Sequence, residues 1–249
     1  METLSAARLG AAAEPPWRRR IADCDWAALG TALDRDGVAT IPGLLDAAAC
    51  AALAQMFDAP AHFRKLVVME THGYGRGAYQ YFAYPLPPVV AGLRDGLYPP
   101  LAAIANLWAA SLGQETRFPD HHAAFLERCH ADGQIKPTPL LLRYGPGDYN
   151  RLHQDLYGAH VFPLQVVVLL SAPGTDFRGG AFVLTEQRAR MQSRVEVVEL
   201  ARGDAVIFPV HHRPLAGPRG ATRAVMRHGV SRVREGLRCT LGVIFHDAA

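Results

Sequence analysis

The sequence predicts an α+β fold in which helices come first and a β core follows. Three observations support this class. The chain has 249 residues, 49% of them hydrophobic, which is enough for one sizeable core. Its first half shows helical periodicity, and from Pro139 onward short apolar runs alternate with Gly, Pro and Asp. Short strands separated by turns are typical of a sandwich or barrel, so we expect helices packed outside a β core.

Residues 1–16 are alanine-rich without a sustained apolar face, which predicts a mobile tail. This opening has neither the basic start nor the apolar block of an export signal, and no stretch is long enough to span a membrane. The four cysteines show no paired spacing, which favours reduced thiols. We therefore expect a cytoplasmic protein without a membrane partner.

Residues 17–138 are predicted to form helical support with a lid-like region. The periodicity and capping residues indicate a strand at Gly37–Pro42 and helices at Trp26–Asp36, Asp46–Phe57 and Pro99–Leu112. Between them, residues 73–88 are dense in Gly, Tyr and Pro, which predicts a loop. That loop either folds over an active site as a lid or contributes core aromatics.

Residues 139–249 are predicted to form the β core, as one structural unit with residues 17–138. The apolar runs between turn residues give seven expected strands: Leu140–Tyr144, Phe162–Ser171, Gly180–Thr185, Val195–Leu200, Asp204–Val210, Thr222–Met226 and Arg238–Phe245.

A candidate metal motif, His153-Gln154-Asp155, precedes the strand expected from Phe162. Two residues apart in an extended segment, His153 and Asp155 project from the same face, so one metal can be reached by both. A further histidine would complete a triad of two histidines and one carboxylate, which binds Fe(II) and leaves coordination positions open. On its own, a His-x-Asp triplet is a weak signal.

The segment from His228 to Leu241, HGVSRVREGLRCTL, strengthens this signal. With its His-Gly-Val and a basic residue ten positions after the histidine, it resembles the prolyl-4-hydroxylase-like branch of the Fe(II)- and 2-oxoglutarate-dependent dioxygenases. The resemblance covers roughly residues 139–247 and implies a double-stranded β-helix (jelly-roll) core. It also implies that His228 completes the iron site with His153 and Asp155, and that Fe(II), 2-oxoglutarate and O2 are required.

The same resemblance assigns Arg238 to the remote carboxylate of 2-oxoglutarate. A guanidinium suits this role because it binds a carboxylate through two hydrogen bonds. Thr240, on the same strand face, can add a hydroxyl donor. Tyr144 and Tyr149 precede the metal motif, where the family has aromatic hydroxyls facing the co-substrate, and they take that role in the resemblance.

A rival assignment uses His211 or His212 as the third ligand, with Arg223 as the anion anchor. We prefer His228 because Arg238 opens a long strand-compatible run. On this interpretation residues 209–227 form an extra hairpin, whose arginines either contact an anionic substrate or are solvated. These arginines are Arg213, Arg219, Arg223 and Arg227.

The sequence therefore predicts an enzyme that hydroxylates an unactivated C–H bond, in the first instance on a peptide or prolyl side chain. One alternative is oxidative dealkylation of nucleobases by an AlkB-type enzyme, because the basic hairpin and the tyrosines could bind DNA or RNA. A non-enzymatic, cupin-like metal-binding module is a third class, which would need no counterpart of Arg238. The sequence leaves the substrate and the oligomeric state open.

Overall fold

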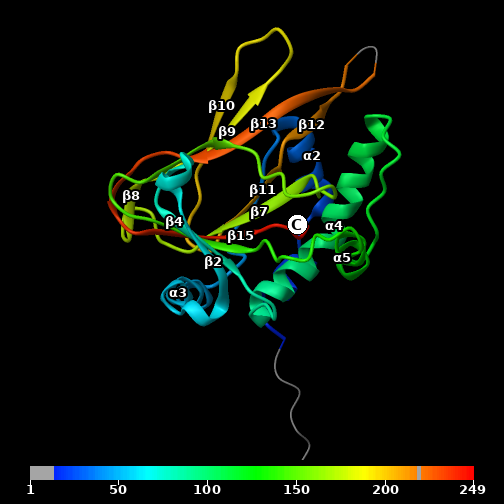
Figure 1. Ribbon diagram of the computed structural model, residues 1–249. Helices are drawn as coiled ribbons and strands as arrows, with labels where there is room; N and C mark the ends of the chain where they lie inside the picture. Colours follow the sequence, from blue (N-terminus) through cyan, green and yellow to red (C-terminus); the bar gives the residue numbers. More distant parts are fainter. Residues whose placement is uncertain (1–13, 218–219) are drawn as a thin grey trace, which may run out of the picture.

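Two antiparallel sheets lie face to face in the computed structural model, which describes residues 14–217 and 220–249 (Figure 1). The larger sheet has seven strands in the order β1-β11-β7-β15-β5-β4-β2. Their bounds are Ala39–Ile41 (β1), Ala205–Pro209 (β11), Leu164–Leu169 (β7), Arg238–Val243 (β15), Leu140–Tyr144 (β5), Ala78–Phe82 (β4) and Phe63–Val68 (β2).

The second sheet has the order β10-β9-β13-β6-β3, and β12 pairs with β13 outside this path. Its strands span Arg194–Val198 (β10), Phe182–Gln187 (β9), Thr222–Val230 (β13), Tyr149–His153 (β6), Gly75–Arg76 (β3) and His212–Leu215 (β12). A small pair joins Phe177–Gly179 (β8) and Val233–Gly236 (β14).

Helices cover the outer face of the seven-stranded sheet. They span Pro16–Ala22 (α1), Trp26–Asp36 (α2), Ala47–Gln55 (α3), Pro88–Ser111 (α4) and His122–Ala131 (α5). Leu33 of α2 and Leu97 of α4 share one hydrophobic core with Val166, Val168 and Leu241 of the sheet. Within the described residues, no helix combines the length and the apolar character needed to cross a membrane.

Period-two alternation gives the seven-stranded sheet two different faces. In β15, Leu241 and Val243 pack into the helix-side core, whereas Arg238 and Thr240 line a cavity between the sheets. In β7, the residues that line this cavity are the polar Gln165 and Val167. Because successive side chains of a strand point to opposite faces, the same strands build both the core and the site.

The prediction of a mixed fold with helices first and antiparallel strands afterwards is confirmed. All seven expected strands are found, and β5 and α2 have the predicted bounds. The predicted tail falls largely on residues 1–13, which lie outside the described residues.

Two parts of the helical region were predicted wrongly. The helix expected from Pro99 begins at Pro88 and runs through Pro99 and Pro100, because its buried stripe continues unbroken from Val90 to Trp108. The loop expected at residues 73–88 contains β3 and β4, since Tyr79 and Tyr81 pair with β5 across the sheet. Besides the predicted strand β1, the expected helical region therefore supplies three further strands, namely β2, β3 and β4.

Candidate active site

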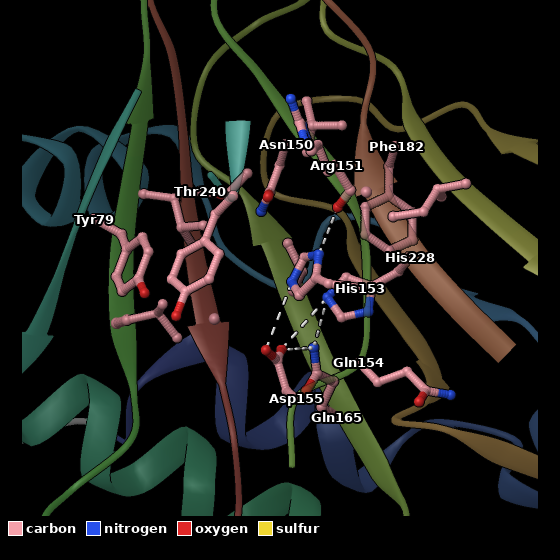
Figure 2. A pocket seen from close by; sticks show the side chains of 18 of the residues that line it. Tyr79, Asn150, Arg151, His153, Gln154, Asp155, Gln165, Phe182, His228 and Thr240 are labelled. Atoms are coloured by element: carbon pink, nitrogen blue, oxygen red, sulfur yellow. Dashed lines mark hydrogen bonds and ion pairs between the residues drawn. The ribbon is translucent and has the colours of Figure 1, made fainter. Parts of the chain in front are cut away.

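Three candidate iron ligands converge at the junction of β6 and β13 (Figure 2). His153 ends β6, Asp155 follows two residues later, and His228 lies opposite His153 in β13. Their ligand atoms all lie within 4.8 Å of one another. The Asp155 carboxylate is 3.5 Å from Nε2 of His153 and 3.4 Å from Nε2 of His228. Two imidazoles and one carboxylate at these separations can hold one divalent ion.

The glycine of the His-Gly-Val motif allows β6 and β13 to approach closely. A Cβ atom on Gly229 would lie 2.8 Å from the backbone oxygen of Asn150 in β6. This contact is shorter than real Cβ atoms show, so a larger residue would push the strands apart. The close approach leaves the rings of His153 and His228 with centroids 4.1 Å apart.

The protonation of the three groups suits metal binding. Nδ1 of His153 lies 2.7 Å from the Arg151 carbonyl, so an N–H there donates and leaves Nε2 free to bind a metal. Burial, reinforced by the nearby His153, lowers the pKa of His228 and keeps it neutral. Burial opposes ionisation of Asp155, but the neighbouring His228, His153 and Gln165 side chains outweigh it and lower its pKa. The donor set therefore fits Fe(II).

Arg238 faces the same cavity with unsatisfied donors. It is only 2% exposed, and its Nε and Nη1 have no hydrogen-bond partner among the residues that the structure describes. Burial lowers its pKa to about 10, so the guanidinium stays charged at neutral pH. A buried cation without a partner fits the remote carboxylate of a dicarboxylic acid, because such a group would supply the missing charge and acceptors. Thr240, also 2% exposed, lies on the same face.

The cavity has a volume of about 370 Å³ and lies between the two sheets. That is within the range of small-molecule sites. The triad, Arg238 and Thr240 share it with Tyr74, which precedes β3, and with mainly apolar and aromatic side chains from both sheets: Tyr79, Leu140, Leu142, Val167, Phe182 and Val230. It can therefore hold a small acid beside the triad in surroundings that largely exclude water.

The two tyrosines predicted to face the co-substrate occupy different places. Tyr144 is fully buried, lines the cavity and lies 3.4 Å from the amide nitrogen of Asn150. Burial raises the pKa of Tyr144 to about 12, so its hydroxyl remains a donor. The prediction for Tyr149 is corrected, because its side chain is not part of the cavity wall and its ring packs near Arg232. A register shift between β6 and β13 brings Asn150 to the cavity in its place.

The rival assignment to His212 has no support in the structure. Within the described residues, the group able to hold a metal consists of His153, Asp155 and His228. His212 lies in β12 opposite Val225, and its ring packs against His211 at a centroid distance of 3.9 Å.

The extra hairpin predicted at residues 209–227 is present as β12 and β13. Arg213, however, is neither solvated nor free for a substrate, because it is 1% exposed and forms an ion pair with Glu186. Arg223 and Arg227 are exposed. Arg219 lies outside the described residues.

Sequence reasoning missed two polar residues at the triad. Gln165 donates from Nε2 to Asp155 Oδ2 at 3.0 Å, and the Tyr157 hydroxyl donates to Asp155 Oδ1 at 2.8 Å. A signal existed for Gln165, since it is the one polar residue in the otherwise apolar strand Leu164–Leu169. Tyr157 follows Asp155 by two residues, a spacing that by itself indicates nothing.

The fold and this site together define the class of non-haem Fe(II)- and 2-oxoglutarate-dependent oxygenases. A family model described as "Oxygenase, catalysing oxidative methylation of damaged DNA" matches residues 77–248, which is more than half of the chain. The chain belongs to this family, Oxygenase-NA. The prediction of an oxygenase is confirmed, and Fe(II), 2-oxoglutarate and O2 are the cofactor and co-substrates that its class implies.

Relatives and solved structures agree with this placement. The chain is 48% identical over 174 residues to the uncharacterized proteins Rv2227 and MT2286 of two Mycobacterium tuberculosis strains, covering 70% of this chain and 75% of each relative.

A Pseudomonas putida prolyl-4-hydroxylase is similar in structure with a TM-score of 0.50 and 18% identity, over 90% of this chain and 99% of that chain. The α-ketoglutarate-dependent epimerase SnoN of nogalamycin biosynthesis has a TM-score of 0.52 and 17% identity, over 87% of this chain and 80% of its own. At these identities the structures support the fold alone.

Proposed function

We propose that this oxygenase hydroxylates the alkyl group of a damaged nucleobase in DNA. In this proposal His153, Asp155 and His228 hold Fe(II), and Arg238 and Thr240 bind the remote carboxylate of 2-oxoglutarate. The two sheets are assigned to a double-stranded β-helix. The observation that carries the oxygenase part of the proposal is the buried Arg238, which lies in the same cavity as the triad and has no partner for Nε and Nη1 within the described residues.

Iron with 2-oxoglutarate and O2 supplies the oxidising power for an unreactive C–H bond. One oxygen atom enters the C–H bond, and the other enters succinate as 2-oxoglutarate loses CO2. On an N-methyl group the product is an N-hydroxymethyl group, which releases formaldehyde and restores the base.

The residues of the chain position the reactants and exclude water. Arg238 orients the co-substrate by two hydrogen bonds, and the buried Tyr144 hydroxyl remains a protonated donor beside it. Val167 and Phe182 form apolar walls next to the triad, which keeps the reacting centre dry.

Two features support a nucleic-acid substrate in addition to the family description. Tyr74, at the cavity, is 50% exposed and stacks on His72 with centroids 5.3 Å apart, so an aromatic surface is available to a flipped base. The strands that carry the two histidine ligands also carry exposed Arg151 and Arg227, for which no ion pair is found within the described residues. Arg151, which lines the cavity, and Arg227, next to His228 in β13, suit contacts with phosphate groups.

The peptide or prolyl substrate expected from the sequence stays an untested prediction. We rank it second because the prolyl hydroxylases similar in structure are under 25% identical and support only the fold. Membership in an oxygenase family removes the support for a non-enzymatic metal-binding module.

The test is turnover on matched substrates. The Fe(II)-loaded protein is incubated with 2-oxoglutarate, O2 and either a single-stranded oligonucleotide carrying one N-methylated base or a panel of proline peptides. We expect formaldehyde and succinate with the methylated oligonucleotide, and neither with the unmethylated control. Peptide hydroxylation without loss of the DNA methyl group would contradict the proposed substrate.

The ligand assignment is tested separately by anaerobic titration with Fe(II) and 2-oxoglutarate, which gives a visible charge-transfer band when both are bound. We expect His228→Ala to lose the band because a metal ligand is gone, and His212→Ala to keep it. The reverse result would move the site to His212.

A further inference from the structure

Both oxygens of the Asp155 carboxylate are held by side chains that are not candidate ligands. The Tyr157 hydroxyl donates to Oδ1 at 2.8 Å, and the Gln165 amide donates to Oδ2 at 3.0 Å (Figure 2 shows the Gln165 contact). Both donors line the cavity, and Asp155 itself is 8% exposed. The carboxylate is therefore fixed at both ends within the site.

Tyr157 is fixed in turn by its own segment. The amide nitrogen of Gln134, which is 1% exposed, donates to the Tyr157 carbonyl at 3.0 Å. The backbone N–H of His160 donates to the Gln134 side-chain oxygen at 2.7 Å. Gly158 permits this contact, because a Cβ there would lie 2.4 Å from Cδ of Gln134. The segment after Asp155 is thus held against Gln134, which limits how far the Tyr157 hydroxyl can move.

Gln165 is a buried amide, 3% exposed, in a strand whose other residues are apolar. Its Nε2 also lies 3.3 Å from Nε2 of His228, and its Oε1 has no hydrogen-bond partner in the described part of the chain. A buried amide that is only partly satisfied is destabilising compared with an apolar residue of the same size. Packing in the sheet therefore does not explain this glutamine, whereas its contact with Asp155 does.

We infer that Tyr157 and Gln165 are positioning residues that form a clamp on Asp155 and set the affinity of the site for its metal. A carboxylate held at one end only can rotate between binding modes, so donors on both oxygens fix its plane before the metal arrives. Hydrogen-bonding partners of metal ligands commonly have this effect on affinity. The inference rests on the proposed function only through the role of Asp155 as a ligand.

The test measures metal binding without turnover. The metal-free protein is titrated with Co(II), whose visible absorption reports affinity and coordination geometry, in wild type and in Tyr157→Phe and Gln165→Leu. We expect each variant to bind Co(II) about 10- to 100-fold more weakly, with an altered spectrum. The melting temperature of the metal-free protein is measured in parallel and should stay close to wild type in Tyr157→Phe.

Tyr81→Phe is the matched control, because the Tyr81 hydroxyl donates to the Tyr157 hydroxyl at 3.2 Å and makes no contact with Asp155. Its Co(II) affinity should stay near wild type. The clamp is overturned if Tyr157→Phe and Gln165→Leu bind Co(II) like wild type, or if Tyr81→Phe loses as much affinity as Tyr157→Phe. The Asp155→Ala variant separates the clamp from the assignment of Asp155 as a metal ligand. Unchanged Co(II) binding in that variant would reject the ligand assignment itself, independently of any substrate.

Discussion

Arg94 and Arg238 are both buried arginines, but they lie in opposite electrostatic surroundings. Arg94, on the helix side of the larger sheet, is 1% exposed and forms an ion pair of 2.7 Å with Asp247. Its remaining donors reach the Ile244 carbonyl and the Tyr84 hydroxyl. Arg238, on the cavity side, is 2% exposed and has unpartnered Nε and Nη1 atoms.

The difference separates an arginine that stabilises the fold from one that binds a ligand. Where the chain supplies the carboxylate, as Asp247 does, each of the three guanidinium nitrogens has a hydrogen-bond partner. Where it supplies none, the charge is left for an anion from outside. Arg213, paired with Glu186, belongs to the first kind. Substitutions at the Arg94–Asp247 pair should therefore reduce stability, whereas a substitution at Arg238 should reduce ligand binding.

The largest effect is expected from Asp247→Ala. Because it leaves Arg94 as an uncompensated buried charge, it should lower the free energy of unfolding by about 3–5 kcal/mol. Urea denaturation measures this. An Asp247→Leu/Arg94→Met double variant should recover part of the loss, since it removes both charges. A loss below about 1 kcal/mol in the single variant would break the comparison.

Arg238→Met should weaken 2-oxoglutarate binding by about 2–5 kcal/mol, because one member of a buried charge pair is removed. In the absence of 2-oxoglutarate the same variant should unfold with at least the wild-type free energy, since no carboxylate of the chain loses a partner and a buried charge without a counterion is removed. Anaerobic titration and urea denaturation give the two values. Unchanged 2-oxoglutarate affinity would remove Arg238 from the site.

The pH dependence of stability sharpens the contrast. Burial alone would raise the pKa of Asp247, but Arg94 and the hydrogen bonds from His130 and Tyr84 outweigh it and hold the pKa below its ordinary value. The ion pair therefore stabilises the fold above the unfolded-state pKa of about 3.9, and this contribution is lost as pH falls below it. The Asp247→Asn variant lacks this ion pair, so its free energy of unfolding, measured by urea denaturation, should fall less than that of wild type as the pH drops through this range. The same pH profile as wild type would contradict the assignment.

The smallest effect on stability is expected for the exposed, unpaired arginines. Arg151→Ala/Arg227→Ala should change the free energy of unfolding by less than about 0.5 kcal/mol. If these residues contact phosphates, removing each contact should make the plot of log affinity for single-stranded DNA against log salt concentration less steep by about one unit of slope. Arg178→Ala is the control, because Arg178 already has Glu235 as a partner. Equal slopes in both variants would argue against a phosphate path along β6 and β13.

Local patterns predicted the β core well because its strands are short apolar runs bounded by turn residues. Leu164–Leu169 is buried throughout, and such a run has few alternatives to a central strand. Residues 75–82 were missed because Gly and Tyr suit a loop as well as a strand, and only pairing with β5 decides between them. Helix α5 was missed because its buried residues include His122, which a hydrophobic pattern does not count.

At the site, the spacing of His153 and Asp155, together with the family resemblance at His228, predicted which side chains come together at the triad. It could not place Tyr149, because the shift in register between β6 and β13 changes which side chains of β6 reach the cavity. Arg213 and Glu186 also escaped prediction, since their pairing joins two strands that are distant in the sequence.

The short distance between β6 and β13 at Gly229 has a consequence for how the chain folds. His153 and His228 are about 75 residues apart in the chain, yet they face each other across one strand pair. A metal that binds both closes a long loop, and the unfolded chain has no equivalent site, so binding energy adds to the energy of folding. The apparent melting temperature should therefore rise with metal concentration, and availability of iron would govern how long the folded enzyme persists.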